Sequence, residues 1–154
     1  MTYRKANVSD SRDLFEWRND QQSREASINS DLVTWEGHEK WLTAKLNSDD
    51  TFMLIFELST QNSSKVGMTR FELERHKGIA EISINVNPTF RGHGLAQKLL
   101  SESIELFASA ETGIHLINAT IRESNVASTK IFIRSGFTEV SRAEGFVHYS
   151  LSIN

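Results

Sequence analysis

The hydrophobic and polar positions of the chain predict seven β-strands. The clearest is Ile79–Asn87, where every second residue from Ala80 to Val86 is hydrophobic and the residues between them are polar, so the two sets face opposite sides of a sheet. Two other strands flank a turn at Gln61–Ser64, which predicts a hairpin. The complete set of expected strands is Thr2–Lys5, Thr51–Leu58, Val66–Leu73, Ile79–Asn87, Leu116–Ile121, Phe137–Val140 and Phe146–Ile153.

Four other stretches repeat their hydrophobic positions with the period of a helix. The first starts with Ser9 or Ser11 as its cap and reaches about Asn19, and the last starts at Ser124 or Asn125 and reaches Arg134 before Gly136. Between them lie Trp35–Leu46, capped by Thr34, and Gly94–Ala110, with Leu95, Leu99, Leu100, Ile104 and Phe107 on its buried face. The order β-α-α-β-β-β-α-β-α-β-β predicts a mixed sheet with helices on its faces, an α/β fold of α+β type.

Composition narrows the classes of function. The 154 residues suit a single domain over residues 1–154, and the net charge of −3 disfavours a nucleic-acid partner, although a local basic patch stays open. The absence of cysteine excludes disulfides, thiolate zinc sites and cysteine nucleophiles. The N-terminus has no apolar run like a signal peptide, and the dense apolar stretch Phe52–Phe56 is too short for a bilayer, so we expect a cytoplasmic protein without membrane contact.

The junction between the strand at Ile79–Asn87 and the next helix, Asn87–Ala96, carries the strongest chemical pattern. Pro88 has no N–H for a strand ladder and ends the strand. The glycines that follow let a ligand approach the backbone, and a helix N-terminus offers unpaired N–H groups, so the junction predicts a phosphate cradle. The Walker pattern fails because no Gly-Lys-Ser/Thr follows, and the dinucleotide fingerprint lacks its third glycine, where Gln97 stands.

Two segments carry a family resemblance. Arg91, Gly94 and Ala96 match Arg/Gln-x-x-Gly-x-Gly/Ala, which resembles motif A of the GNAT (Gcn5-related N-acetyltransferase) family, whose loop binds the pyrophosphate of acetyl-CoA. Ala119–Asn125, with the Ser135-Gly136-Phe137 that follows the next helix, resembles the family's motif B. The resemblance implies the GNAT fold, a central, mostly antiparallel twisted sheet with helices on both faces, and acetyl-CoA as cofactor. Trp17–Asp20, Trp35–His38 and Trp41-Leu42 resemble a subgroup that acetylates amino groups of nucleotide-linked sugars.

The resemblance assigns cofactor contacts to three sets of residues. The strand backbone would hold the thioester carbonyl, the loop would hold the pyrophosphate, and the last helix would contact the pantetheine arm. In that order the sets are Ile84, Asn85 and Val86; Arg91, Gly92, His93, Gly94, Leu95 and Ala96; and Asn125, Ser128 and Phe132. Asn125 also reads as a simple helix cap, and Ser128 as a solvent-facing residue.

One position departs from the family pattern. GNAT members often place a tyrosine about seven residues after the motif B asparagine, as the acid for the CoA thiolate. Counting from Asn125 reaches Phe132, which has no proton to give, so this role is not carried over. Water, another residue or the ammonium product would then protonate the sulfur.

The candidate general base is Glu81, on the polar side of the strand before the loop. A carboxylate there would take the proton of the amine directly or through water, and Ser83 and Asn85 share its side and would position that water. A solvated strand face is the alternative. His38 and His148 are further base candidates, although a lone histidine is more often a packing or surface residue. The five histidines show no metal-ligand spacing, so no metal is expected.

Candidates for the acceptor site combine guanidinium and aromatic groups. Arginine can hold a phosphate or carboxylate through two hydrogen bonds, and an aromatic ring can stack on a nucleobase or a sugar. The alternatives are that Trp17 and Trp41 belong to the core and that Arg18 makes an ordinary surface ion pair. The expected acceptor residues are Arg18, Asn19, Trp41, Arg70 and Phe71.

Together these patterns predict an enzyme that transfers an acetyl group from acetyl-CoA to the primary amine of a small molecule. Transfer would be direct within a ternary complex, because the chain has no cysteine to carry the acetyl group. A nucleotide-linked amino sugar is the favoured acceptor. The rivals are an N-terminal or ribosomal-protein acetyltransferase and a non-catalytic acyl-CoA-binding module. The sequence leaves a homodimer open.

Overall fold

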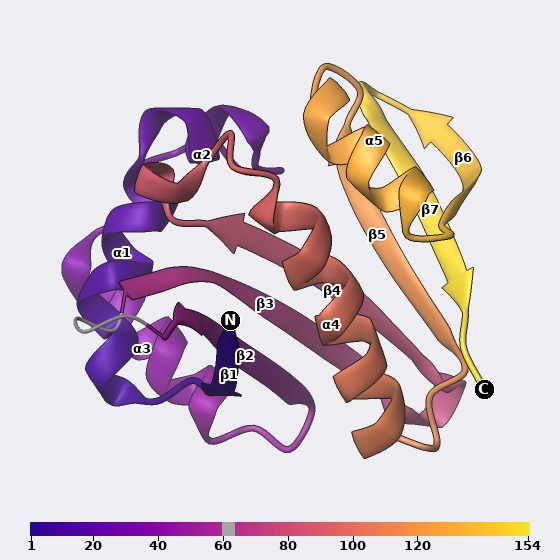
Figure 1. Cartoon of the computed structure of the whole chain (residues 1–154), viewed down its shortest axis with the longest axis horizontal. Helices are drawn as coiled ribbons and strands as arrows, with labels where there is room; N and C mark the ends of the chain where they lie inside the picture. The colour runs from indigo at the N-terminus through magenta and orange to yellow at the C-terminus, as the bar shows by residue number, and fades with distance from the viewer. Residues whose placement is uncertain (60–63) are drawn as a thin grey trace.

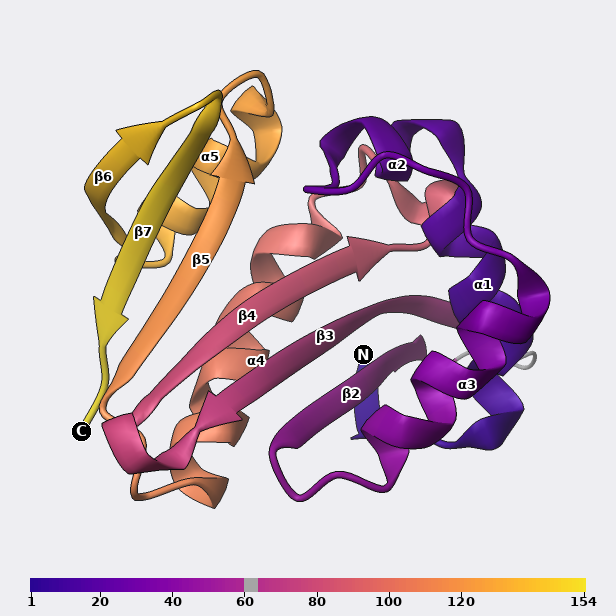
Figure 2. The same cartoon turned by 180° about the vertical axis from the view of Figure 1, so that it is seen from behind.

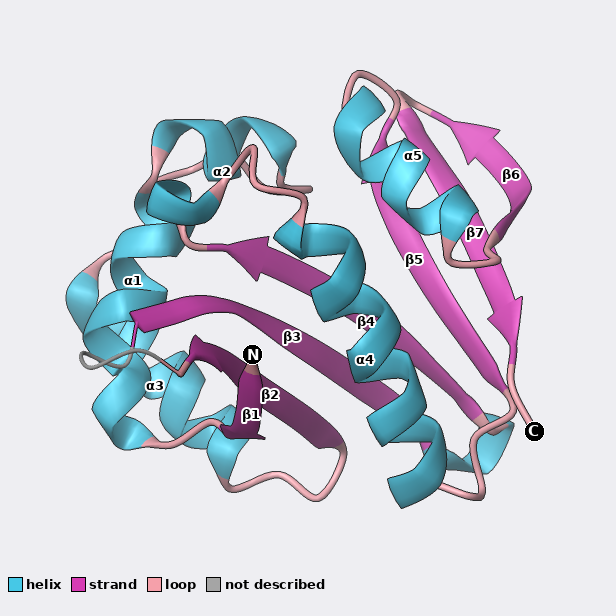
Figure 3. Cartoon of the chain, in the orientation of Figure 1, coloured by secondary structure: helices cyan, strands magenta, loops and turns pink. Residues whose placement is uncertain are grey.

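A computed structural model describes residues 1–59 and 64–154, which build one seven-stranded sheet with helices on both faces (Figures 1 and 3). The strand order is β1-β2-β3-β4-β5-β7-β6, and every neighbouring pair is antiparallel except β4 and β5. The strands are β1 (Thr2–Lys5), β2 (Thr51–Leu58), β3 (Ser64–Glu74), β4 (Ile79–Val86), β5 (Leu116–Arg122), β6 (Thr138–Ala143) and β7 (Phe146–Ser152).

The helices divide between the two faces of the sheet. In Figure 1, α4 and α5 lie in front of the strands, and in the reversed view of Figure 2 they lie behind them, with α1 and α3 now beside β2 and β3. The α-helices are α1 (Ser11–Asn19), α2 (Gln21–Ala26), α3 (Trp35–Leu46), α4 (Leu95–Ala110) and α5 (Val126–Arg134), and the 3₁₀ turns are Val8–Asp10, Arg75–Lys77 and Pro88–Phe90.

Each layer of helices covers its own hydrophobic core. On the α4 and α5 side the core includes Phe71 and Phe107, whose rings stack with centroids 4.0 Å apart. On the other side, Leu14 of α1 and Leu42 of α3 pack against β2 and β3. The alternation of side chains along the strands sends hydrophobic residues to both layers, which is why β2 is buried over most of its length.

The strands β4 and β5 separate after a short paired segment. Their parallel pairing joins Ile79–Glu81 to Leu116–Asn118 and goes no further along β4. Figure 1 shows the two strands starting side by side near the C-terminus and diverging toward the start of α4. We call this region, between residues 82–86 of β4 and 119–122 of β5, the split. Glu81 is the last residue of β4 that pairs with β5, so it stands at the vertex of the split.

Most of the predicted strands and helices are confirmed, and the differences concern one helix, one helix cap and one turn. Trp35–Leu46 and Thr51–Leu58 are found with the predicted bounds, and Thr34 caps α3 by accepting from Gly37 N–H. The helix α2 was not expected, so the observed order has one helix more than predicted. The predicted cap of α1 is wrong, since the N-cap is Asp10 and Ser11 is the first helical residue. In the predicted turn Gln61–Ser64, residues 61–63 lie outside the described residues and Ser64 already belongs to β3.

Among the described residues, no helix combines the length and the apolar character needed to cross a membrane.

A buried carboxylate ties the N-terminal strand to α1. Asp10 is 0% exposed and accepts hydrogen bonds from Arg4 Nη1 at 2.8 Å and Nη2 at 2.7 Å and from Asn7 N–H at 2.9 Å. Lys65 Nζ of β3 lies 2.9 Å from its Oδ1. Burial alone would raise the pKa of Asp10, but these partners outweigh it and hold the pKa at about 2.

This pKa predicts an acid-dependent loss of stability. Because the folded pKa is below the ordinary value of 3.8, the ionised carboxylate stabilises the fold above about pH 4 and this contribution is lost as the pH falls toward 2. A shift from 3.8 to about 2 corresponds to about 2 kcal/mol. Denaturant unfolding of the wild type and of Asp10→Asn between pH 7 and pH 2 should show a difference in unfolding free energy that shrinks with the pH. A constant difference would contradict the assignment.

Candidate active site

The second half of β4 turns backbone N–H groups toward the split. Asn87 N–H donates to Val66 O of β3 at 2.8 Å. Since N–H groups alternate in direction along a strand, Asn85 N–H also points to β3, whereas Ile84 and Val86 point theirs toward β5. Pairing with β5 has already ended at Glu81, so these two groups are donors on an unpaired edge. Of the three residues expected to hold a thioester carbonyl, only Ile84 and Val86 therefore have suitably directed N–H groups.

The loop after β4 leaves the N-terminus of α4 without a side-chain cap. Gly94 is the N-cap and has φ of 72°, a left-handed conformation that favours glycine. A Cβ at Gly92 or Gly94 would have no atom within 4 Å, so this backbone lies open. By contrast, α2, α3 and α5 each have a side-chain cap. Open N–H groups at the start of a 16-residue helix suit an anion, as expected for residues 92–96.

The side chain of Arg91 is already engaged within the protein. Its guanidinium donates to Asp20 Oδ2 at 2.6 Å, Gln22 Oε1 at 3.1 Å and Ser23 Oγ at 2.5 Å. The hydrogen bond from Arg91 holds the pKa of Asp20 below its ordinary value. Ser23 Oγ in turn donates to Asn85 Oδ1 at 3.2 Å. Arg91 therefore fastens the loop to α2, and its contribution to an anion site is to fix the backbone of the loop.

The motif B residues meet at the start and middle of α5. Asn125 is the N-cap and its Oδ1 accepts from Ser128 N–H at 3.2 Å, so the cap interpretation is confirmed. The Asn125 side chain caps the helix with its oxygen. Its NH₂ group is the part suited to donate to a pantetheine carbonyl. Phe132 is 3% exposed and packs edge-on against Phe137, with ring centroids 5.0 Å apart. His93 of the loop is exposed.

The position of Phe132 gives a prediction for the thiolate proton. We expect Phe132→Tyr to leave kcat unchanged or to raise it, because the added hydroxyl would supply a proton donor on the helix expected to contact the pantetheine arm. The measurement is kcat together with the Kd for CoA. A collapse of kcat with intact CoA binding would show that the position tolerates no hydroxyl.

A polar face runs across β4, β5 and β7 on the side opposite α4 and α5, which Figure 2 shows from the front. Glu81 Oε1 accepts from Thr120 Oγ1 at 3.0 Å, and Thr120 Oγ1 lies 3.1 Å from His148 Nδ1. Ser83 and Asn85 follow Glu81 on the same side of β4, with partners from β3 and α2. We call Glu81, Ser83, Asn85, Thr120 and His148 the polar face. The structure thus brings the candidate base and its two neighbours together beside the split.

Two guanidinium groups extend this face toward α1 and α3. Arg70 of β3 donates to Ser83 Oγ at 3.4 Å and lies over the Trp41 ring, 4.9 Å from its centroid. Its Nε is 2.9 Å from Glu72 Oε1, an ion-pair distance without hydrogen-bond alignment. Burial lowers the pKa of Arg70; Glu72 opposes this shift, and the like charge of Arg18 adds to it. Arg70 is thus a buried cation with Glu72 beside it and the like charge of Arg18 nearby, and its guanidinium is of a kind that can bind an anionic group.

Arg18 supplies the second guanidinium. Its Nη2 donates to Asn29 O at 2.6 Å, and its Nη1 is buried without a hydrogen-bond partner in residues 1–59 and 64–154. Burial lowers the pKa of Arg18, and the nearby Arg24 lowers it further. The alternative of an ordinary surface ion pair does not describe this side chain.

Two expected acceptor residues have other roles. Phe71 is 0% exposed and stacks on Phe107 in the α4 core, because it follows Arg70 on β3 and so faces the opposite side of the sheet. Asn19 uses its side chain to hold a loop, donating to Val33 O and accepting from Val33 N–H, both at 2.8 Å. The expectation that Phe71 contacts the acceptor is therefore wrong, and for Asn19 it stays a prediction beside the loop-holding contacts that the structure shows.

Two other aromatic candidates are packing residues. Trp17 is 4% exposed and belongs to the core under α1 and α3. His38 is buried beside Phe15 and Trp41, and its Nε2 lies 2.9 Å from Ser11 O. Burial lowers the pKa of His38, so the ring is neutral and acts as a donor to that carbonyl. It lies in the α3 core rather than on the polar face.

The structure adds three residues that the sequence did not single out for function: Asp20, Thr120 and Arg122. Arg122 of β5 donates to Ser27 O at 2.5 Å and Ile28 O at 3.2 Å, which joins β5 to the loop after α2. Thr120 and Arg122 alternate with the buried Ala119 and Ile121, and this alternation is the pattern that could have identified them.

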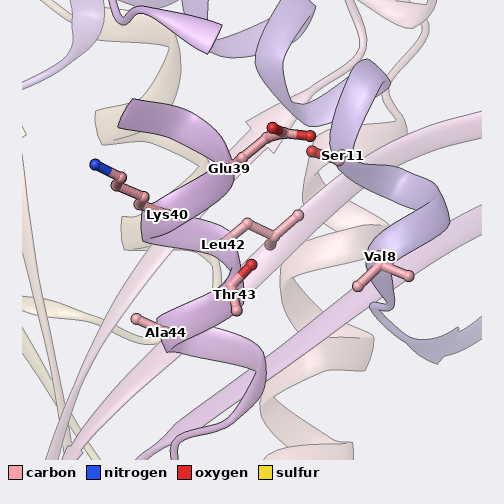
Figure 4. Close-up of a pocket in the computed structure, with 7 residues that line it drawn as sticks. All are labelled: Val8, Ser11, Glu39, Lys40, Leu42, Thr43 and Ala44. Carbon is pink, nitrogen blue, oxygen red and sulfur yellow. The ribbon is translucent and has the colours of Figure 1, made fainter. Parts of the chain in front are cut away.

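A surface pocket lies away from these residues. It is formed between α3 and the start of α1 and is lined by Val8, Ser11, Glu39, Lys40, Leu42, Thr43 and Ala44 (Figure 4). None of the expected cofactor or acceptor residues lines it. Within the described part of the chain, no three histidine, cysteine or acidic residues gather as metal ligands.

The split in the sheet, the open glycine loop and the uncapped N-terminus of α4 are suited to a transferase with a phosphate-bearing acyl donor. Residues 1–138 match the family model for the acetyltransferase (GNAT) domain. The chain therefore belongs to the GNAT acetyltransferase family and is an acetyl-CoA-dependent N-acetyltransferase. No curated protein matches the chain significantly.

Solved structures with the same fold cover nearly the whole chain. Spermidine N-acetyltransferase from Vibrio cholerae, in complex with CoA and spermine, is 15% identical with a TM-score of 0.86, over 99% of this chain and 95% of that one. Ribosomal-protein-alanine N-acetyltransferase from Brucella melitensis is 24% identical with a TM-score of 0.79, over 99% and 100%. A domain from Methanocaldococcus jannaschii is 20% identical with a TM-score of 0.85, over 99% and 97%. At these identities the likeness shows the fold.

Proposed function

We propose that this enzyme acetylates the primary amine of a small molecule that also carries an anionic group, with a nucleotide-linked amino sugar as the favoured acceptor. The observation that carries the proposal is the placement of Glu81 at the vertex of the split, on the same side of the sheet as the guanidinium of Arg70. Glu81 can take the proton of the amine, while the Arg70 guanidinium binds the anionic group of the acceptor.

The residues divide the work as follows. The N–H groups at residues 92–97 would hold the pyrophosphate, and those of Ile84 and Val86 would stabilise the oxyanion that develops as the amine attacks, an effect worth a few kcal/mol for backbone donors. Acetyl-CoA supplies the activated acetyl thioester. Glu81 accepts the proton of the amine, directly or through a water that Ser83 and Asn85 position. As the nitrogen–carbon bond forms, the carbon–sulfur bond would break; the attacking nitrogen, which becomes cationic, would pass its extra proton to the thiolate directly or through water and leave as a neutral amide.

The acceptor would lie over Arg70, Arg18 and Trp41. Arg18 is a like charge for Arg70, and Glu72 opposes its effect; a phosphate or carboxylate bound by both guanidiniums would add a further opposite charge. The Trp41 ring, partly buried beside Arg70, offers a surface for a sugar or a base. A polycationic acceptor fits these charges poorly, and this supports an anionic molecule over a polyamine.

The test is acetyl-CoA turnover with a matched set of amines. CoA release would be followed with a UDP-linked amino sugar, the same amino sugar without its nucleotide, spermidine, and a short peptide with an N-terminal alanine. The proposal predicts the highest kcat/KM for the UDP-linked sugar, with a higher KM when the nucleotide is removed. Preference for the peptide would support protein N-terminal acetylation instead, and CoA binding without turnover of any amine would contradict a catalytic role for the site.

A further inference from the structure

Three side chains form a hydrogen-bonded chain across three strands of the polar face. Glu81 comes from β4, Thr120 from β5 and His148 from β7, and the contacts are 3.0 Å and 3.1 Å. Thr120 and His148 stand directly opposite each other in the antiparallel register of β5 and β7. Glu81, the first member of this hydrogen-bonded series, lies at the vertex of the split, where the parallel pairing of β4 with β5 ends.

The chemistry of the three groups fixes the direction of these hydrogen bonds. An ionised carboxylate only accepts, and a threonine hydroxyl has one proton to donate. When Glu81 is ionised, the Thr120 hydroxyl therefore donates to Oε1, and its lone pair must accept from His148. The ring then carries its proton on Nδ1, an assignment that follows from the network. With an ionised Glu81, His148 donates to Thr120 and Thr120 donates to Glu81. These two hydrogen bonds hold the carboxylate in one orientation.

This orientation has a consequence for proton transfer. With Oε1 held by Thr120, Oε2 is the oxygen that can receive a proton from the amine or its bridging water. Without this hydrogen bond the carboxylate plane could rotate and would point an oxygen lone pair at the amine for only part of the time, and small losses of alignment reduce proton transfer strongly.

We infer that Thr120 and His148 are positioning residues for the candidate base: they orient the Glu81 carboxylate so that Oε2 accepts the proton during acetyl transfer. The inference rests on the proposed role of Glu81. Neither residue is expected to contact the acetyl group, and both act through Glu81.

The same two strands provide a matched control. Ser150 Oγ of β7 donates to Asn118 Oδ1 of β5 at 2.6 Å, and these residues also stand directly opposite each other. The pair is two residues along from Thr120 and His148 on the same side of the sheet. Asn118 is also the β5 residue that pairs with Glu81, so Ser150→Ala removes a comparable bridge between β5 and β7 close to Glu81 while leaving the hydrogen bonds of Glu81, Thr120 and His148 in place.

The first experiment separates positioning from stability. Thr120→Val keeps the shape of the side chain and removes the hydroxyl, and it should lower kcat about 10- to 100-fold, the range expected for losing a hydrogen bond to a charged group. The KM for acetyl-CoA should stay the same. Thr120→Ser should restore most of the lost kcat, and Ser150→Ala should leave kcat at the wild-type level with a similar melting temperature. An equal loss in Thr120→Val and Ser150→Ala would reduce the role to strand packing and overturn the inference.

A second pair of variants tests His148. The amide nitrogen of asparagine can stand near the Nδ1 position, so His148→Asn should keep a donor to Thr120, whereas His148→Leu should not. We expect kcat to fall in the leucine variant and to recover in the asparagine variant. Equal kcat values in the two variants would contradict a donor role for the ring.

A double-mutant cycle with Glu81→Gln distinguishes this inference from the proposal beneath it. If Thr120 acts through Glu81, then Thr120→Val should change kcat by less than about 2-fold in the Glu81→Gln background. A full additional loss there would overturn the inference while leaving the base assignment intact. If Glu81→Gln alone retains wild-type kcat, the base assignment fails, and the inference fails with it.

Discussion

Replacing Glu81 with glutamine is expected to lower kcat about 10²- to 10⁴-fold, the range by which a positioned general base accelerates proton transfer. Glutamine has nearly the same shape but cannot accept the proton of the amine. The Kd for acetyl-CoA should remain at the wild-type value, because the proposed cofactor contacts come from the backbone of β4, from residues 92–97 and from α5, and none of them involves the Glu81 side chain. The measurements are steady-state kcat and an equilibrium titration with CoA.

The control for this variant is the same substitution at another glutamate of the sheet. Glu74, at the end of β3, is exposed and pairs with Lys77 at 3.1 Å. Glu74→Gln makes the same chemical change outside the polar face and should leave kcat within about 2-fold of the wild type, as is usual for exposed pairs. Parallel losses in Glu81→Gln and Glu74→Gln would mean that charge on the sheet, not a base at the vertex, matters for turnover.

Replacing Gly94 with valine should weaken acetyl-CoA binding about 100-fold. The residue has φ of 72°, which a β-branched side chain adopts only with strain, so the loop would shift and the N–H groups at the start of α4 would move. Losing two charge-assisted hydrogen bonds of about 1.5 kcal/mol each corresponds to that factor. Calorimetric titration with CoA measures it.

The matched control is Gly145, in the turn between β6 and β7. It has φ of 82°, and a Cβ there would meet no atom within 4 Å, as at Gly94. Gly145→Val therefore introduces the same kind of strain outside residues 92–97, in a turn whose Gly145 O accepts from Glu123 N–H at 2.8 Å, and should lower the melting temperature without changing the Kd for CoA. If both variants weaken CoA binding equally, general destabilisation rather than a phosphate loop explains the effect.

The strands and long helices follow from local patterns, and this part of the fold was predictable. The alternation at Ile79–Asn87 placed Glu81, Ser83 and Asn85 on one side, and the polar contacts of these side chains lie there. The helix α2 was missed because Gln21–Ala26 has a single apolar residue and hence no hydrophobic period. Its formation depends on the cap at Asp20 and on the guanidinium of Arg91, which is distant in sequence.

The sequence predicted the parts of the site that come from one contiguous stretch of residues, and not the parts that come from residues distant in sequence. The glycine loop and its helix are contiguous, so their geometry could be read from Asn87–Ala96. The partners of Glu81 could not, because Thr120 and His148 meet through the register of β5 and β7, which distant packing sets. Arg70 and Phe71 cannot both contact the acceptor, because the side chains of neighbouring residues on a strand face opposite sides of the sheet. Only Arg70 lies on the side of Glu81.

We propose that acetyl-CoA binds at the split and at the start of α4. Amide hydrogen exchange with and without CoA tests this placement directly, because it needs no knowledge of the acceptor. We expect CoA to slow exchange at Ile84, Val86 and residues 92–97 and to leave the N–H groups of β1 and β2 unchanged. Protection confined to other segments, or no change in residues 84–97 at saturating CoA, would contradict it.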